Sequence, residues 1–165
     1  YKGFYDLQQL GWIEYLPKLI AVQAEGSAAI YNAWVKSNSI EPVNSNTVAD
    51  SISVDIPRDG LKALRAIRES DGWGLTVSDD EILNAQKQMS QSTGIFCEPA
   101  SAAAFAGMLK AVRHNQLSSE DKVVILATGS GLKDIPAASN EIQLPTSLDP
   151  NLEIAEDLLK GYAKR

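Results

Sequence analysis

A glycine-rich segment, Thr128 to Asp134, is the strongest candidate for a binding site, because it follows the clearest predicted strand of the chain. That strand reads Lys-Val-Val-Ile-Leu-Ala over residues 122–127. In a parallel α/β sheet, ligands bind beyond the carboxyl ends of strands, where glycines let backbone amides approach closely. The segment Thr128-Gly-Ser-Gly131 matches neither the dinucleotide-binding pattern nor the P-loop. Two interpretations therefore remain: a ligand-binding loop, or a glycine-rich turn into a helix.

Two carboxylates have contexts that could also do chemistry. Glu98 precedes Pro99 and an alanine-rich run, so it lies at a predicted helix start beside a face of small residues. It either faces a ligand or is simply favoured near the positive helix terminus. Asp50 closes the segment Thr-Val-Ala-Asp after a polar loop, where it is either functional or a turn and cap residue.

The remaining reactive side chains favour structural roles. His114 is the one histidine and ends a predicted helix, so it complements the helix dipole and forms no Ser-His-acid arrangement. Cys97 is the one cysteine, so an internal disulfide and a multi-thiolate metal site are both excluded. No zinc-like cluster of histidine and cysteine exists, and we expect no metal. Lys133 is expected to pair with Asp134 or to lie at a helix end.

Composition indicates an ordinary globular protein. The chain has 165 residues, 44% of them hydrophobic and 22% charged, which argues against disorder. No apolar run approaches the roughly 18 residues of a membrane helix, so we expect no membrane partner. The formal charge of -6 argues against a broad nucleic-acid surface. A single cysteine favours a reducing, cytoplasmic setting.

Helical and strand patterns alternate along the chain and predict an α/β class with a mainly parallel sheet. Strands are expected at 19–22, 73–77 and 122–127. Helices are expected over 2–11, from 26, over 61–72, over 79–94, from 99 and from 150, with a capping box at Ser78 and Glu81. We expect one domain or fragment over 1–165, in which 136–165 form a C-terminal loop and helix. The first residue is Tyr1 rather than methionine, so we expect either a removed segment or an excerpt of a longer protein.

Four segments, taken in order, resemble threonine synthase: residues 19–26, 47–50, 94–103 and 128–134. More broadly, the chain is similar to the fold-type II pyridoxal-phosphate (PLP) enzymes, which include threonine dehydratase and the tryptophan synthase β chain. The similarity covers residues 1–135, and its most specific elements are Glu-Pro-Ala and Thr-Gly-x-Gly-Leu-Lys-Asp. It implies an α/β, Rossmann-like three-layer αβα architecture.

The resemblance also implies roles for individual residues. Thr128 matches the hydroxyl that meets the pyridine nitrogen of PLP, and Gly129 lets the backbone pass near the ring. Glu98 matches the acid of the Glu-Pro element near the cofactor, while Ala49 and Asp50 match a segment close to the ring. A neutral hydroxyl at the nitrogen makes the ring a milder electron sink than a carboxylate would. For Glu98 and Asp50 we expect a wall or electrostatic role rather than proton transfer.

The activity implied by the resemblance converts O-phosphohomoserine and water to threonine and phosphate. The Schiff-base lysine and the phosphate-binding loop would lie upstream, so this C-terminal part should hold no catalytic residue and be inactive alone. Its expected partners are an amino-acid substrate, the missing N-terminal half and a second copy in a homodimer. Ser130 stands where such enzymes often have histidine, and Thr-Val-Ala-Asp is more dehydratase-like. A threonine/serine dehydratase, another β-replacement enzyme, or a stand-alone non-catalytic Rossmann-like module therefore remain alternatives.

Overall fold

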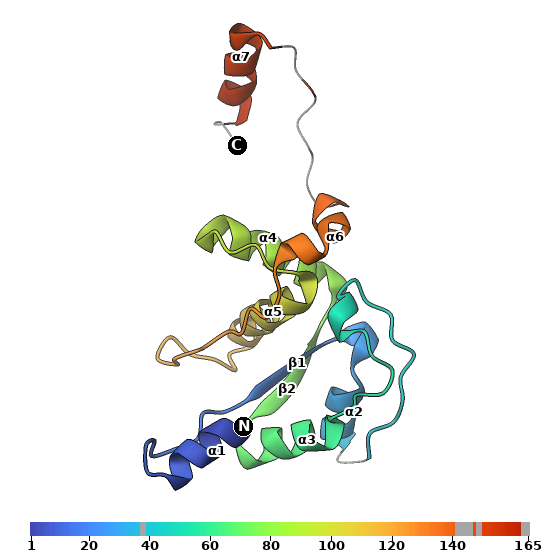
Figure 1. The fold of residues 1–165 in the computed structure, drawn as a ribbon, viewed down its shortest axis with the longest axis vertical. Helices are drawn as coiled ribbons and strands as arrows, with labels where there is room; N and C mark the ends of the chain where they lie inside the picture. Colours follow the sequence, from blue (N-terminus) through green and yellow to red (C-terminus); the bar gives the residue numbers. More distant parts are fainter. Residues whose placement is uncertain (37–38, 141–146, 148–149, 163–165) are drawn as a thin grey trace.

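A short parallel sheet forms the centre of the molecule (Figure 1). The computed structural model describes residues 1–36, 39–140, 147 and 150–162. Strands β1 (Ile20–Ala24) and β2 (Trp73–Val77) pair in parallel, with Ile20 opposite Trp73 and Ala24 opposite Val77. Both lie where the sequence predicts strands, so that part of the α/β prediction is confirmed.

Helices precede, connect and follow the two strands. They are α1 (Lys2–Gln9), α2 (Ala29–Lys36), α3 (Gly60–Glu69), α4 (Asp79–Thr93), α5 (Pro99–Arg113), α6 (Ile135–Asn140) and α7 (Leu152–Tyr162). Short 3-10 turns are η1 (Glu25–Ser27), η2 (Asp50–Ile52) and η3 (Gly131–Lys133). Within the residues that the structure describes, we find no helix with the length and apolarity to cross a membrane.

Two pairs of helices cover the sheet, with α2 and α3 on one face and α4 and α5 on the other (Figure 1). Gly74 on β2 lies against the rings of Tyr31 and Trp34 of α2. Ala21 on β1 lies opposite Gly74, and the next residue, Val22, belongs to the other face, because successive strand residues point to opposite sides. There Val22 contacts Gly107 of α5, where a Cβ would overlap the valine side chain. The three-layer αβα arrangement is therefore confirmed, and a small residue sets how closely α5 approaches.

The hydrophobic core fills the space between the sheet and the α4–α5 pair. It is built largely from small side chains on α5 that pack on Val77 of β2 and Ile82 of α4. Cys97 belongs to this core, with 1% of its surface exposed and its Sγ 3.7 Å from Met89 Sδ. Burial raises the pKa of this thiol, which agrees with the interpretation of an inert core cysteine.

The predicted strand at 122–127 is wrong for this structure. Residues 121–128 pair with no strand among the described parts of the chain. Val124 and Leu126 are 85% and 72% exposed. A strand needs a neighbour that accepts its backbone hydrogen bonds, and periodicity predicts the apolar side chains but not the neighbour.

A second difference follows the glycine-rich segment. The loop expected from residue 136 begins instead with helix α6. The backbone N–H of Ala137 donates to Asp134 Oδ1 at 3.3 Å, and Pro136 lies in the first turn, where a missing N–H costs nothing. The rest of that expected loop, residues 141–145, lies outside the described residues. The helix expected from 150 is present as α7.

The start of α4 is tied to the end of α5 through one carboxylate. The expected capping box is present, with Ser78 Oγ accepting from the Glu81 N–H and Glu81 Oε2 accepting from the Ser78 N–H. Glu81 also accepts from Lys110 Nζ at 3.0 Å and from Arg113 at 2.6 Å. Partial burial alone would raise the pKa of Glu81, but these donors outweigh it and hold the pKa below its ordinary value.

We predict that Glu81→Gln lowers the free energy of unfolding at neutral pH and flattens its dependence on acid. Because folding lowers the pKa of Glu81, its contribution is present above the unfolded-state pKa and is lost as the pH falls through the folded-state pKa. Urea titrations between neutral and acidic pH test this. Glu14→Gln, at an exposed carboxylate, serves as the control. Parallel pH curves for wild type and Glu81→Gln would contradict the role.

Candidate functional site

A short antiparallel contact joins two distant segments and creates the site. Gly131 N–H donates to the Phe96 carbonyl at 3.1 Å, and Glu98 N–H donates to the Gly129 carbonyl at 3.0 Å. Between them, Cys97 and Ser130 form an antiparallel bridge. The two elements that the sequence analysis singled out, Glu-Pro-Ala and Thr-Gly-x-Gly, are thus held side by side by their backbones.

The two glycines of this loop are required because a side chain would not fit there, and not because the backbone has an unusual conformation. Neither has a positive φ angle. A Cβ on Gly129 would overlap the carboxylate of Glu98, and a Cβ on Gly131 would overlap the ring of Phe96. Close approach of two segments is therefore the physical reason for glycine at both positions.

Glu98 is a buried carboxylate with partners from two other segments. It is the N-cap residue of α5, yet its side chain makes no capping hydrogen bond. Only 8% of the side chain is exposed, and Oε2 lies 3.4 Å from Ser51 Oγ and 3.6 Å from Lys133 Nζ. Lys133 lies at the end of η3, so the prediction of a helix end is confirmed. Its carboxylate partner is Glu98 and not the predicted Asp134. A charged pair turned toward neighbouring segments favours a functional role over a capping role.

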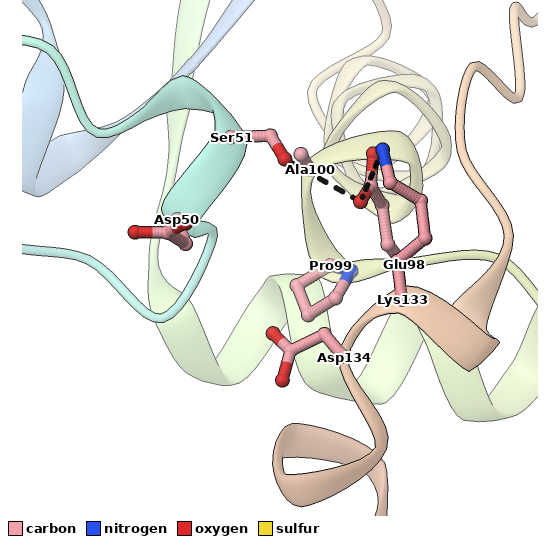
Figure 2. A pocket seen from close by; sticks show the side chains of 7 residues that line it. All are labelled: Asp50, Ser51, Glu98, Pro99, Ala100, Lys133 and Asp134. Carbon is pink, nitrogen blue, oxygen red and sulfur yellow. Dashed lines mark hydrogen bonds and ion pairs between the residues drawn. The ribbon is translucent and has the colours of Figure 1, made fainter.

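A cavity of about 320 Å³ opens beside this ion pair. Its lining consists of Asp50, Ser51, Glu98, Pro99, Ala100, Lys133 and Asp134. Figure 2 shows Ser51 and Lys133 reaching the Glu98 carboxylate from two sides, while Asp50 points away from it. The lining combines three acids with one exposed lysine, so it is polar and suits a charged small molecule.

The segment that carries Ala49 and Asp50 is held against the start of α4. Asp79 accepts hydrogen bonds from the hydroxyl of Thr47 and, at 3.1 Å, from the backbone N–H of Val48. Asp50 is exposed and lines the cavity, whereas Ala49 has 0% exposure and packs in the core. The structure therefore places Asp50 in the same cavity lining as Glu98 but buries Ala49 in the core, and the cofactor-binding role of both stays a prediction.

Thr128 does not belong to the lining of this cavity. Its residue surface is exposed, and its Oγ1 lies 3.1 Å from the hydroxyl of Ser101. Ser101 is 1% exposed and also bonds the backbone of Gly129, through N–H at 2.6 Å and carbonyl at 3.2 Å. Thr128 and Gly129 are thus anchored by a buried serine on α5, and their cofactor contacts stay predictions.

Sequence reasoning missed the anchoring residues Ser51 and Ser101. Ser101 is the one hydroxyl within the alanine-rich first turns of α5, and that contrast is a signal that could have found it. Ser51 carries no comparable signal, because its partner Glu98 is 47 residues away. In the described residues no cluster of three or more histidine, cysteine or acidic side chains is arranged to hold a metal ion. His114 is the C-cap residue of α5, as expected.

The comparisons with known proteins define the class of protein. The family model described as "Pyridoxal-phosphate dependent enzyme" matches residues 1–129. The chain therefore belongs to the family of pyridoxal-phosphate dependent enzymes.

Within this family, several curated relatives are threonine synthases. The chain is 41% identical over 167 aligned residues to "Threonine synthase" of Methanosarcina acetivorans, with 99% of this chain and 41% of that protein covered. It is 36% identical to "Threonine synthase" of Methanocaldococcus jannaschii, with 97% of this chain and 40% of that protein covered. The chain spans about 40% of the length of the curated relatives it matches.

Solved structures support the fold. A fungal L-serine ammonia-lyase from Rhizomucor miehei matches with a TM-score of 0.60 at 24% identity, over 78% of this chain and 40% of that one. Maize serine racemase matches with a TM-score of 0.58 at 17% identity, over 89% of this chain and 39% of that one. At these identities the likeness is one of fold alone.

We predict that Gly129→Ala disrupts the site, because the new methyl group overlaps the Glu98 carboxylate. Overpacking of this kind costs about 1–3 kcal/mol of folding free energy. Thermal and urea unfolding measure the loss. Gly3→Ala is the matched control, since nothing lies within 4 Å of a Cβ at Gly3. Equal stability of the Gly129→Ala and Gly3→Ala proteins would contradict the packing described here.

Proposed function

We propose that this chain is the C-terminal part of a PLP-dependent threonine synthase that converts O-phosphohomoserine and water to threonine and phosphate. One observation carries the proposal: Thr128 and Gly129 are anchored on Ser101 and lie against the carboxylate of Glu98. These residues belong to the two elements that resemble threonine synthase, and the 34–41% identical relatives bear that name.

The residues present fit the ring-nitrogen side of PLP. Thr128 offers an exposed, neutral hydroxyl whose position is fixed by a buried partner. Gly129 offers backbone without a side chain, so a flat ring can approach the loop closely. Thr128 and Gly129 would therefore hold the nitrogen side, with Glu98 as a charged wall behind Gly129.

When bound, PLP withdraws electrons from the substrate carbon skeleton, and the protein controls how strongly it does so. Thr128 contributes a hydrogen bond to the ring nitrogen without the full charge of a carboxylate. A neutral hydroxyl at the ring nitrogen keeps electron withdrawal by the ring moderate, which suits elimination and replacement at the β and γ carbons of the substrate. Glu98 and Asp50 shape and polarise the cavity, and neither is assigned a proton transfer.

The ion pair of Lys133 with Glu98 fixes the wall of the cavity. Glu98 is buried while Lys133 is 64% exposed, so the lysine shields the carboxylate at the cavity mouth. Lys133 and Thr128 lie on the same glycine-rich segment, because η3 begins at the second of its two glycines, Gly131. The cavity and the Thr128 hydroxyl therefore flank Glu98 and together form the proposed site for an amino-acid substrate.

The proposed partner is the remaining part of the same enzyme, and the complete enzyme is a cytoplasmic homodimer. Support comes from the share of the relatives that this chain spans and from the exposed apolar side chains of residues 123–126. Val124 and Leu126 would be covered when a strand of the remaining part pairs with this segment. The lysine that binds the cofactor and the phosphate-binding loop belong to that remaining part.

The complete protein is expected to release phosphate from O-phosphohomoserine with the simultaneous appearance of threonine. The direct assay is phosphate release and amino-acid analysis on the PLP-loaded protein. The competing dehydratase activity is assayed in parallel as 2-oxobutyrate formed from threonine. Formation of 2-oxobutyrate without phosphate release would replace our proposal with the dehydratase. Failure to bind PLP would favour a non-catalytic module.

The isolated chain provides the matched control for this assay. We expect no turnover from residues 1–165 alone, and turnover after addition of the separately produced remaining part. Borohydride reduction with PLP, followed by mass spectrometry, shows whether one lysine of this chain forms a stoichiometric adduct. Such an adduct, together with turnover by the isolated chain, would contradict the proposal.

Thr128→Val in the complete enzyme should retain bound cofactor but lose turnover. Valine preserves the volume and removes the hydroxyl, while the lysine that binds the cofactor is untouched. A hydrogen bond to a group that gains charge contributes roughly 1.5–3 kcal/mol, so kcat should fall about tenfold to a hundredfold. The cofactor's absorbance and kcat are measured together. Thr93→Val, at the end of α4, is the control, and unchanged kcat in Thr128→Val would refute the role of Thr128.

A further inference from the structure

Ser101 is a buried hydroxyl that touches the exposed Thr128 and the backbone next to it. Its Oγ accepts from the Gly129 N–H at 2.6 Å and lies 3.1 Å from Thr128 Oγ1 and 3.2 Å from the Gly129 carbonyl oxygen. The residue is 1% exposed and lies in the first turn of α5, behind the proposed cofactor-binding face. It therefore touches no substrate or cofactor itself.

The hydroxyl hydrogen of Ser101 has two possible acceptors. Ser101 Oγ already accepts from Gly129 N–H, so its own proton goes either to the Gly129 carbonyl or to Thr128 Oγ1. The Gly129 carbonyl already accepts from the Glu98 N–H at 3.0 Å. Thr128 Oγ1, at 3.1 Å, has no other hydrogen-bond partner among the described residues. The geometry thus favours donation from Ser101 to Thr128.

When a hydroxyl oxygen accepts a hydrogen bond on one side, the hydrogen of that hydroxyl points to another side. With Ser101 donating to Thr128 Oγ1, the proton of Thr128 faces away from the buried serine and toward the exposed side of the loop. Without Ser101, the Thr128 hydroxyl would turn freely and would present a donor or a lone pair with similar ease.

We propose that Ser101 is a positioning residue that holds the Thr128 hydroxyl as a hydrogen-bond donor to the pyridine nitrogen of PLP. The inference rests on the proposed function and adds a residue to it. Its chemical consequence is specific: a hydroxyl fixed as a donor matches an unprotonated ring nitrogen and disfavours a protonated one, which would itself need an acceptor. Ser101 thereby sets the electronic state of a ring it does not touch.

The direct test is the 15N resonance of ring-labelled PLP in the complete holoenzyme, because protonated and unprotonated pyridine nitrogens resonate far apart. Wild type and Ser101→Thr, which keeps the hydroxyl, should give the resonance of an unprotonated, hydrogen-bonded nitrogen. Ser101→Ala should shift that resonance and lower kcat about tenfold, with KM within about twofold. Ser92→Ala, which removes a helical serine on α4, is the matched control and should change neither quantity. An unshifted resonance in Ser101→Ala would overturn the proposal.

A double-mutant cycle separates positioning from a merely structural role. If Ser101 acts through Thr128, adding Ser101→Ala to Thr128→Val should cause no further loss of kcat. Additive losses in the double variant would overturn the proposal. Ser101→Cys keeps the volume but donates weakly, so it should resemble Ser101→Ala in the 15N spectrum even where the alanine variant folds poorly.

These experiments distinguish the failure of this inference from the failure of the proposed function. A complete protein that binds no PLP overturns both. A protein that binds PLP and releases phosphate from O-phosphohomoserine, but whose Ser101→Ala spectrum matches wild type, overturns the role of Ser101 alone.

Discussion

The contact between residues 96–98 and 129–131 is the constraint on which the site depends. Two backbone hydrogen bonds align these segments, and the absence of a Cβ at Gly129 and Gly131 lets them touch. The positions of Glu98 and Lys133 follow from that alignment. Glu98 reaches Gly129 because its own N–H is bonded there, and Lys133 reaches Glu98 because η3 begins at the second glycine. A change of one residue in this pairing would separate the carboxylate from its lysine.

The same close approach recurs between the layers of the fold. Gly107 brings α5 against Val22 of β1, and this helix carries both Glu98, its N-cap, and Ser101. The sheet therefore determines how closely α5 packs, and the position of α5 determines where the Glu98 carboxylate and the Ser101 hydroxyl lie. Because a small residue allows the helix to pack closely on the sheet, the distance between them fixes where the site residues on the helix lie.

Local patterns predicted local structure well. The capping box at Ser78 and the start of α5 at Pro99 each depend on neighbouring residues in the chain, and each is present. The strand at 122–127 failed because pairing needs a partner that periodicity cannot supply. The same limit applied to the site: motifs identified Glu98 and Thr128, while Ser51 and Ser101 act through contacts across many residues. Side-chain types predict candidates, but only tertiary packing pairs them.

The exposed segment 121–128 has a consequence for how the chain behaves in solution. Its backbone presents hydrogen-bonding groups without a neighbouring strand in the described structure, and Val124 and Leu126 face solvent. Residues 123–127, Val-Val-Ile-Leu-Ala, contain no charge, no proline and no glycine. Such a stretch is a template for edge-to-edge addition of identical strands. For this chain on its own, we expect self-association through that edge to compete with correct assembly.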